Sequence, residues 1–239
     1  MKKYLSHIGL LILLGLLLFL YSFSSLRNEG KKVSKIEIQF NEGTNEFLTH
    51  EMVNKLLIQN QLTVKNQAKS VIDLQGLENN VLLNPYIETA TVFLTVDGLL
   101  SAVVKQREPI FRVNNNSMSY YIDVHGIKVP LSTNFSARVP LVTGKIKEKD
   151  LVEVTNLIKR INTDDFLKKE IIGIDKKSND EYVFSVRSGN YKIEFGSLDD
   201  VTTKFKKIKA FYNKAFVDKT IHQYKTINVK YHNQVVCAK

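Results

Sequence analysis

Residues 84–110, Asn-Pro-Tyr-Ile-Glu-Thr-Ala-Thr-Val-Phe-Leu-Thr-Val-Asp-Gly-Leu-Leu-Ser-Ala-Val-Val-Lys-Gln-Arg-Glu-Pro-Ile, decide the fold of the first half of this chain. Their first part alternates apolar and polar side chains, as a half-buried strand does, with apolar positions at Ala90, Val92, Leu94 and Val96. Asp97 and Gly98 supply a tight two-residue turn, because Gly adopts a positive φ without strain. Residues 99–106 return as a second strand, which Pro109 ends by removing a backbone donor. The hairpin is mostly apolar and contains no catalytic group, so it indicates docking rather than chemistry.

A strand and two short helices precede this hairpin. Residues 33–40 alternate as a strand does. Thr49 caps a helix with one apolar face, formed by Met52, Val53, Leu56 and Leu57, and Leu48 is placed to pack against Val53. Asp73 caps a second helix, which ends at Asn84-Pro85. The side chains of this helix that are predicted to point inward are Leu74, Leu77, Val81 and Leu82. The predicted order over residues 33–106 is therefore β-α-α-β-β.

Beyond Phe111 the pattern is richer in strands. Strands are predicted at residues 119–124, 127–131, 171–175, 181–187, 190–195 and 226–236. Two amphipathic helices are predicted at residues 148–161 and 200–216, and Asp199 and Asp200 complement the dipole at the start of the second. Their apolar stripes are Leu151, Val154, Leu157, Ile158 and Ile161 in the first, and Val201, Phe205, Ile208, Tyr212 and Ala215 in the second. This half of the chain predicts a second, mixed domain.

An apolar run close to the start predicts a membrane anchor. The run lies within residues 4–26 and consists mainly of Leu, Ile, Gly and Phe. Its length of about 20 residues is enough to cross roughly 30 Å of hydrocarbon as a helix. The alternative is a cleaved signal peptide, whose apolar core usually runs about 7–15 residues before an Ala-x-Ala-like site. Here the run is longer, and Ser22 and Ser24 match such a site poorly. Basic residues flank both ends, so charge alone does not decide the orientation.

The chain carries a net charge of +10, and most of the excess lies in its second half. Residues 141–239 contain 20 Lys and Arg against 13 Asp and Glu, whereas residues 31–140 contain 11 against 10. Clustered basic residues can bind nucleic acid, but no known reader motif is present, and an anchor with the bulk of the chain outside the cytosol would keep these residues from it. Anionic lipid headgroups or an acidic partner surface fit the excess better. The densest group is predicted as a solvated face of the helix at 200–216, with Lys204, Lys206, Lys207, Lys209 and Lys214.

Residues that carry catalysis or bind metals form no recognisable pattern. The five histidines form no metal-like pair and have no Cys partner, and the common nucleotide-binding, zinc-protease and serine-hydrolase motifs are absent. Asp123 and His125 belong to one strand-turn, where an Asp that opens the turn is the more common arrangement. The one cysteine, Cys237, is interpreted as a strand-end residue rather than a nucleophile. We therefore expect no enzyme, no catalytic residue, no cofactor, no metal and no small-molecule substrate.

Several motifs, in order along nearly the whole chain, resemble the FtsQ/DivIB family of bacterial cell-division proteins. They are the hairpin, Tyr121-Ile-Asp-x-x-Gly126, Val139-Pro-Leu-Val-Thr-Gly144, a Lys- and Phe-rich helix at 201–216, and Ile227-Asn-Val-Lys-Tyr231. The resemblance implies an α+β chain with an N-terminal transmembrane helix, a β-α-α-β-β POTRA domain, and a mixed α/β domain with a largely antiparallel sheet. The corresponding boundaries are a cytoplasmic tail at 1–7, a transmembrane helix at 8–26, the POTRA domain at 33–108 and an FtsQ-type β domain at 109–239.

The predicted last strand is the candidate binding site. A final strand often lies on a sheet edge, where its unpaired N–H and C=O groups can accept another chain. From the residues alone, a core strand that merely completes the sheet is an equal alternative. The resemblance favours the edge, because in FtsQ the terminal strands bind the juxtamembrane segment of FtsB, which travels with FtsL. The partner-binding residues that it implies are Ile227, Asn228, Val229, Lys230, Tyr231, Val235 and Val236.

The resemblance also implies the function and the location. The chain is expected to be a non-enzymatic scaffold that recruits membrane-anchored division proteins of the FtsB/FtsL type during septum formation, by strand addition. It is expected to cross the cell inner membrane once, with its amino terminus in the cytoplasm and its bulk in the periplasm. Two other classes remain open: a periplasmic cell-wall enzyme, which needs a cleft of convergent polar residues, and a POTRA-type transport or assembly component, which needs a β-barrel or repeated POTRA units.

Overall fold

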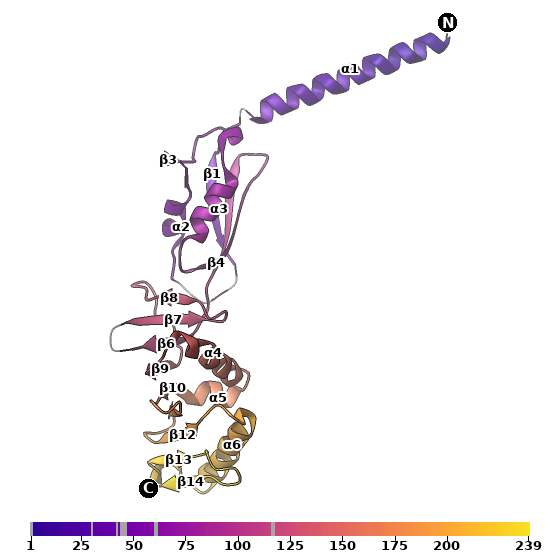
Figure 1. Ribbon diagram of the computed structural model, residues 1–239. Helices are drawn as coiled ribbons and strands as arrows, with labels where there is room; N and C mark the ends of the chain where they lie inside the picture. Colours follow the sequence, from indigo (N-terminus) through magenta and orange to yellow (C-terminus); the bar gives the residue numbers. More distant parts are fainter. Residues whose placement is uncertain (1, 30, 42, 44–46, 60–61, 116–117) are drawn as a thin grey trace. The chain divides into compact units, whose positions relative to one another are not determined.

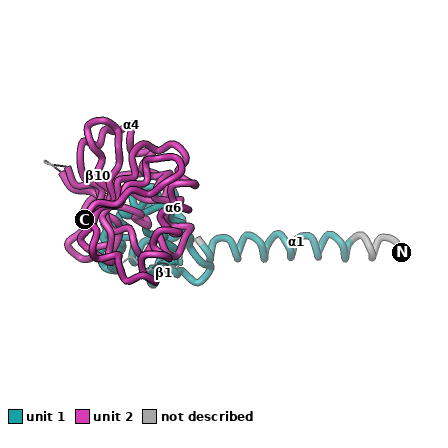
Figure 2. The backbone as a smooth tube through the Cα atoms, turned by 90° about the horizontal axis from the view of Figure 1, so that it is seen from below, with its two compact units in different colours: residues 1–106 teal, residues 107–239 magenta. Residues whose placement is uncertain are grey.

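The computed structural model describes residues 2–29, 31–41, 43, 47–59, 62–115 and 118–239. These residues belong to two compact units, Met1–Gln106 and Arg107–Lys239 (Figure 2). The predicted α+β class is confirmed, because an apolar helix is followed by a small three-stranded sheet with helices and then by a larger sheet with helices. Each unit has its own cluster of buried apolar side chains.

Helix α1 (Lys2–Glu29) contains the predicted membrane anchor. Its segment Ile8–Asn28 has a mean hydropathy of 2.2 and is not buried against the rest of the chain. An exposed apolar surface of this size is unfavourable in water, and 21 residues are long enough to cross a bilayer as a helix. Among the described residues, this is the one helix that is long and apolar enough for a membrane crossing.

The sheet of the first unit consists of β1 (Lys35–Phe40), β4 (Ile87–Leu94) and β5 (Leu99–Gln106). β5 lies in the middle, parallel to β1 and antiparallel to β4. Helices α2 (His50–Leu56) and α3 (Leu74–Leu82) complete the β-α-α-β-β order, which confirms the arrangement predicted for a POTRA domain (Figure 1). Between the helices lie β2 (Ile58–Gln59), β3 (Leu62–Thr63) and the short 3-10 helix η1 (Lys69–Val71).

Both predicted helix caps are present. The side chain of Thr49 accepts the N–H of Met52 at 3.3 Å, and Asp73 accepts the N–H of Gly76 at 2.9 Å. These bonds satisfy N–H groups that the first turn of a helix leaves without a partner. The prediction that Leu82 points inward is wrong, since this side chain is 40% exposed at the end of α3.

The hairpin turn between β4 and β5 has three residues rather than two. The N–H of Thr95 donates to the carbonyl of Leu99 at 2.9 Å, and the N–H of Gly98 donates back to Thr95 at 3.2 Å. Val96 therefore lies in the turn, where it is 69% exposed, and its predicted place in the strand is wrong. Gly98 has a φ of +84°, and a Cβ there would lie 2.5 Å from the carbonyl oxygen of Lys32. Only glycine tolerates both conditions.

The second unit contains one nine-stranded sheet, in the order β14-β13-β12-β11-β10-β9-β6-β7-β8. Five neighbouring pairs are antiparallel and three are parallel, so the sheet is largely antiparallel as predicted. Pro109, predicted to end the hairpin, instead opens β6, where the first residue of a strand needs no ladder donor. The strands are β6 (Pro109–Asn114), β7 (Ser119–Asp123), β8 (Lys128–Pro130), β9 (Leu141–Gly144), β10 (Ile171–Lys176), β11 (Tyr182–Val186), β12 (Lys192–Gly196), β13 (Thr226–Asn228) and β14 (Val236–Ala238).

Three helices lie along the same side of this sheet, α4 (Glu148–Asn162), α5 (Asp165–Glu170) and α6 (Val201–Val217) (Figure 1). The apolar stripes predicted for the two longer helices are buried as expected. The short helix α5 was not predicted. Its cap is Asp164, which accepts the N–H groups of Phe166 and Leu167 at 3.1 Å. The 3-10 helix η2 (Ile221–Gln223) leads from α6 towards β13.

Asp123 opens the turn between β7 and β8, as predicted. One carboxylate oxygen accepts the N–H groups of His125 and Ile127, at 2.9 and 2.8 Å. The other oxygen lies 2.8 Å from Nη1 of Arg107. A buried carboxylate with these three donors is satisfied within the fold, so Asp123 has a structural part in this turn.

Candidate partner-binding edge

The predicted final strand at residues 226–236 is divided into two strands in the structure. β13 covers only Thr226–Asn228, and it pairs with β12 on one side and with β14 on the other. Its central residue, Ile227, lies opposite Ile193 of β12 and opposite Cys237 of β14. The prediction of one continuous edge strand is therefore wrong. Both sides of β13 are occupied by the chain's own backbone, and the outer position belongs to β14.

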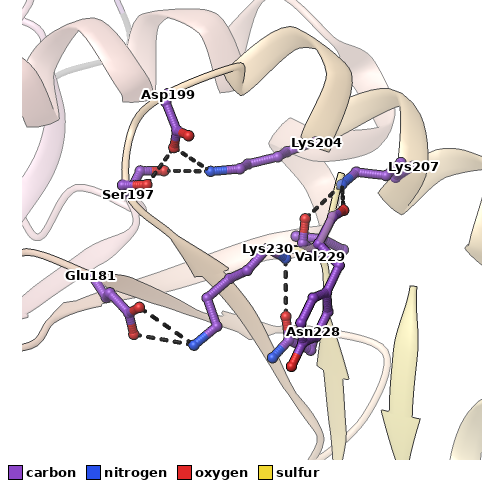
Figure 3. Close-up of polar contacts among 9 residues, drawn as sticks. Glu181, Ser197, Asp199, Lys204, Lys207, Asn228, Val229 and Lys230 are labelled. Carbon is purple, nitrogen blue, oxygen red and sulfur yellow. Dashed lines mark hydrogen bonds and ion pairs between the residues drawn. The ribbon is translucent and has the colours of Figure 1, made fainter. Parts of the chain in front are cut away.

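The side chains of Asn228 and Lys207 bind the backbone that follows β13 (Figure 3). The side-chain oxygen of Asn228 accepts the N–H of Lys230 at 2.9 Å, a local bond that competes with a strand ladder. The ammonium group of Lys207 on α6 donates to the carbonyl oxygens of Val229 and Tyr231, at 2.7 and 2.6 Å. The N–H of Val229 still donates to the carbonyl of Glu194 on β12 at 3.1 Å. However, the carbonyl groups of Val229 and Tyr231 are directed towards Lys207, and the strand pairing ends there.

The predicted partner-binding residues are divided between the core and the surface. Ile227 and Val229 are fully buried in the core of the second unit. Val235 is half-buried, whereas Tyr231 is 51% exposed and Val236 is 43% exposed. In this conformation an incoming chain can reach Tyr231 and Val236 but not the two buried side chains.

Asn228 and Lys230 are already engaged within the second unit. The amide nitrogen of Asn228 donates to Oε2 of Glu194 on β12 at 2.6 Å. Nζ of Lys230 lies 3.2 Å from Oε2 of Glu181, and this hydrogen-bonded ammonium lowers the pKa of Glu181. The stem of Lys230 covers Gly196, where a Cβ would lie 2.6 Å from its Cγ. Since ion pairs at the surface are weak, Lys230 is fixed mainly by this packing.

β14 is the outer strand at this end of the sheet. It pairs with β13 alone, and in the described part of the chain no strand lies beyond it. The carbonyl of Ala238 accepts the N–H of Lys225 at 2.8 Å, which holds the end of the strand. Cys237 packs against the core, and burial raises the pKa of its thiol. A thiol with a raised pKa is a poor nucleophile, so β14 offers backbone groups and small apolar side chains.

The opposite edge of the same sheet has a different composition. There, β8 ends at Pro130, which lacks a backbone N–H, and begins with Lys128. Nζ of Lys128 lies 2.5 Å from Oε1 of Glu148 on α4. Pro and Lys on an edge strand are the residues that discourage pairing with another chain. β14, with the sequence Val-Cys-Ala, contains neither.

Lys204, predicted as part of a solvated basic face, is buried instead (Figure 3). It is 4% exposed, and its Nζ lies 2.9 Å from the carbonyl oxygen of Ser197 and 2.6 Å from Oδ1 of Asp199. The hydrogen bond from Lys204, followed by that from the Ser197 hydroxyl, lowers the pKa of Asp199 to about 2. This ammonium group joins the start of α6 to the segment that precedes it.

Two more lysines of α6 bind within the unit. Nζ of Lys209 lies 2.5 Å from Oδ2 of Asp164, the cap of α5. Lys207 holds the segment after β13, and burial, followed by the charge of Lys204, lowers its pKa. Of the five predicted lysines, Lys206 and Lys214 are the exposed ones. The basic surface of α6 is therefore smaller than its sequence suggests.

Comparison with known families identifies the chain. A family model described as FtsQ/DivIB, C-terminal related, matches residues 108–238, and a model of the POTRA-like domain matches residues 31–105. The chain belongs to the FtsQ/DivIB family. The first match encloses the whole nine-stranded sheet, including β14, and the second encloses β1 to β4 and most of β5. The resemblance inferred from the sequence motifs is confirmed.

Individual relatives are more distant. The chain is similar to the cell division protein DivIB of Clostridium acetobutylicum, with 24% identity over 97 residues. This match covers 38% of the chain and 39% of that relative. Among solved structures, POTRA1-2 of the periplasmic domain of Omp85 from Anabaena is matched at 16% identity, covering 65% of this chain and 93% of that chain. Its TM-score of 0.24 is too low to carry an argument.

One N-terminal apolar helix in a division-protein family fits a single-pass membrane anchor.

Proposed function

We propose that this FtsQ/DivIB-family protein is a non-catalytic scaffold of the division machinery, and that it binds another membrane-anchored division protein, of the FtsB/FtsL type, at β14. Family membership supports a role in cell division. The contrast between the two edges of the nine-stranded sheet carries the choice of site: Lys128 and Pro130 occupy one edge, and an uncharged Val-Cys-Ala strand occupies the other.

In this mode of binding, an extended segment of the partner adds as a further strand beside β14. Backbone hydrogen bonds then supply part of the affinity, and side chains supply the selectivity. An edge strand of three residues offers few outward N–H and C=O groups. The exposed side chains of Tyr231 and Val236 must therefore contribute to the contact. Aromatic and aliphatic side chains of this kind are common anchors of protein interfaces.

The membrane anchor supports the same function. With α1 in the membrane, the protein and a similarly anchored partner diffuse in one plane, which raises their effective concentration. A short edge strand can then suffice for recruitment. We propose a cytoplasmic amino terminus and a location of both compact units on the outer side of the membrane, in the periplasm, as in the family that the motifs resemble.

Co-purification of the full-length protein with an FtsB-like partner tests this proposal. Val236→Asp introduces a charge on the outer strand and is expected to weaken capture by about tenfold or more, which corresponds to about 1.4 kcal/mol. The matched control is Val217→Asp, which changes an exposed valine on α6. Equal capture by both folded variants, at the level of the unmodified protein, would exclude β14 as the binding strand.

A further inference from the structure

One end of the first unit presents two exposed valines among lysines. Val96 in the hairpin turn is 69% exposed, and Val71 at the end of η1 is 58% exposed. Around them in the fold lie residues 31–34, 65–71 and 96–98, which together contain four lysines and one aspartate. We refer to this group as the lysine-valine tip, and its main side chains are Lys31, Lys32, Lys65, Lys69, Val71 and Val96.

Backbone hydrogen bonds fix this tip to the segment that leaves α1. The N–H of Ser34 donates to the carbonyl of Gly98 at 2.8 Å, which ties the hairpin turn to that segment. The N–H of Lys69 donates to the carbonyl of Lys31 at 2.9 Å, which ties η1 to the same place. Both valines are therefore carried by loops that are held next to the first residues after the membrane helix.

The length of the connection places the tip close to the bilayer. The apolar segment of α1 ends at Asn28, and Lys31 is already bonded to the tip. Three Cα–Cα steps of about 3.8 Å allow at most about 11 Å between these two residues. The headgroup region adds roughly 5–8 Å on each side of the hydrocarbon core. With α1 in the membrane, Lys31 therefore lies in or just beyond the headgroup region, and the tip bonded to it begins there.

The charges of the tip match an anionic lipid surface. The ammonium groups of Lys31 and Lys69 both donate to the carbonyl oxygen of Val96 at 3.3 Å, so two positive charges lie beside the turn that carries this exposed valine. Lys31, Lys32 and Lys65 are exposed, whereas Lys69 is half-buried and also donates to Oδ1 of Asn28 at 3.1 Å. Segments that bind the membrane interface combine apolar side chains with neighbouring lysines. The apolar side chains enter the acyl boundary, and the ammonium groups bind the headgroups.

We propose that the lysine-valine tip is a membrane-contact surface, with Val71 and Val96 inserted at the headgroup boundary and the four lysines bound to anionic lipid. The proposal rests on α1 remaining in the membrane, as proposed above, and does not depend on partner binding at β14. A second point of contact with the bilayer restricts rotation of the POTRA-like domain, residues 31–105, about its short connection to α1. It therefore limits the directions in which this POTRA-like domain can face.

Fluorescence quenching in nanodiscs tests the proposal on the full-length protein. In a Cys237→Ser background, the variants Val96→Cys, Val71→Cys and Leu83→Cys each carry an environment-sensitive dye. Leu83, which is 81% exposed, follows α3 and precedes β4, whose eight residues extend over roughly 26 Å before the hairpin turn. It therefore serves as a matched position at the other end of the unit. The discs contain phosphatidylcholine and phosphatidylglycerol, and the quencher is a headgroup-spin-labelled phosphatidylcholine.

We expect quenching at positions 96 and 71 to exceed that at position 83 by about twofold or more. The double variant Lys31→Gln/Lys69→Gln should reduce quenching at both valine positions, whereas Lys55→Gln, at an exposed lysine of α2, should not. Quenching at 96 and 71 no stronger than at 83 would overturn the proposal, and so would failure of the protein to stay in the disc. Crosslinking of a partner from Val236 is expected to be unchanged in Val96→Asp, so a failure of the tip and a failure of β14 give different results.

Discussion

The ammonium group of Lys207 lies 2.7 Å from the carbonyl oxygen of Val229, so helix α6 holds the backbone directly after β13 ends. The same ammonium group reaches the carbonyl of Tyr231. These contacts lie where the chain leaves the sheet after β13. After this segment the chain returns as β14, which pairs with the side of β13 that would otherwise be free.

Removal of the Lys207 ammonium group is expected to loosen this segment. Lys207→Met keeps most of the side-chain stem but loses two charge-assisted hydrogen bonds, so we expect the free energy of unfolding to fall by about 1–2 kcal/mol. Amide exchange of residues 230–235 should become faster. Lys206→Met, at the exposed neighbouring position, should change stability by no more than about 0.5 kcal/mol. Equal effects of both substitutions in urea titrations would contradict the structural part assigned to Lys207.

Val229 and Tyr231 are expected to separate folding from binding. Val229→Ala removes methyl groups from a fully buried side chain, and we expect a loss of about 1.5–3 kcal/mol in the free energy of unfolding. Tyr231→Ala changes a side chain that is 51% exposed, and it should leave stability within about 0.5 kcal/mol while weakening partner capture. Urea titration of both variants, paired with co-purification, measures the two effects. If Val229→Ala were as stable as the unmodified protein but no longer captured the partner, Val229 would belong to the binding surface and not to the core.

Substitution of Gly98 and of Gly126 by Ala compares the cost of backbone strain alone with the cost of strain and a steric clash together. Both have a positive φ, +84° and +80°, but only at Gly98 would an added Cβ meet the backbone, 2.5 Å from the carbonyl oxygen of Lys32. At Gly126 nothing lies within 4 Å. Gly126→Ala should therefore cost about 1 kcal/mol from backbone strain. Gly98→Ala should cost clearly more, because Lys32 must also move. Thermal unfolding of both variants checks the order, and a smaller loss at Gly98 would contradict the close approach.

The ion pair between Asp199 and Lys204 is expected to respond to acid. Its hydrogen bonds lower the pKa of Asp199 from 3.8 to about 2. The carboxyl group thus has a lower pKa in the folded than in the unfolded chain, so it stabilises the fold above about pH 4 and loses this effect as the pH falls to about 2. Because the Asp199 side chain is 71% exposed, the contribution is below about 1 kcal/mol. The stability difference between the unmodified protein and Asp199→Asn should shrink over this range in urea titrations. A difference that does not change with pH would contradict the ion pair.

Local signals in the sequence were sufficient for most of the first unit. Thr49 and Asp73 mark helix starts that the structure confirms, and the apolar alternation before the hairpin predicts β4. The turn itself was misplaced by one residue. The pattern Asp-Gly is typical of a two-residue turn, but the bond between Thr95 and Leu99 leaves three residues in the loop, and Val96 leaves the strand.

The candidate site was harder to predict because distant contacts determine it. Residues 226–236 have strand-forming side chains throughout, and period alone does not show where such a run breaks. The break depends on Lys207, more than twenty residues earlier in the chain, and on the local bond of Asn228. In the same way, the contacts that bury Lys204 lie outside its helix, with the carbonyl of Ser197 and with the ring of Phe195 on β12, 5.3 Å away. The sequence does hold one signal, because Lys204 stands three residues after Val201 and four before Ile208, beside the buried stripe.

Site-specific photo-crosslinking in cells tests the use of β14 most directly. A photoreactive residue is placed at Val236, and an equivalent one at Lys128 on the opposite edge strand serves as the matched control. We expect Val236 to crosslink to a membrane-anchored division protein of the FtsB/FtsL type, and Lys128 to give little or none of that product. Absence of a crosslink from Val236 when the same partner is captured from Lys128 would contradict strand addition at β14.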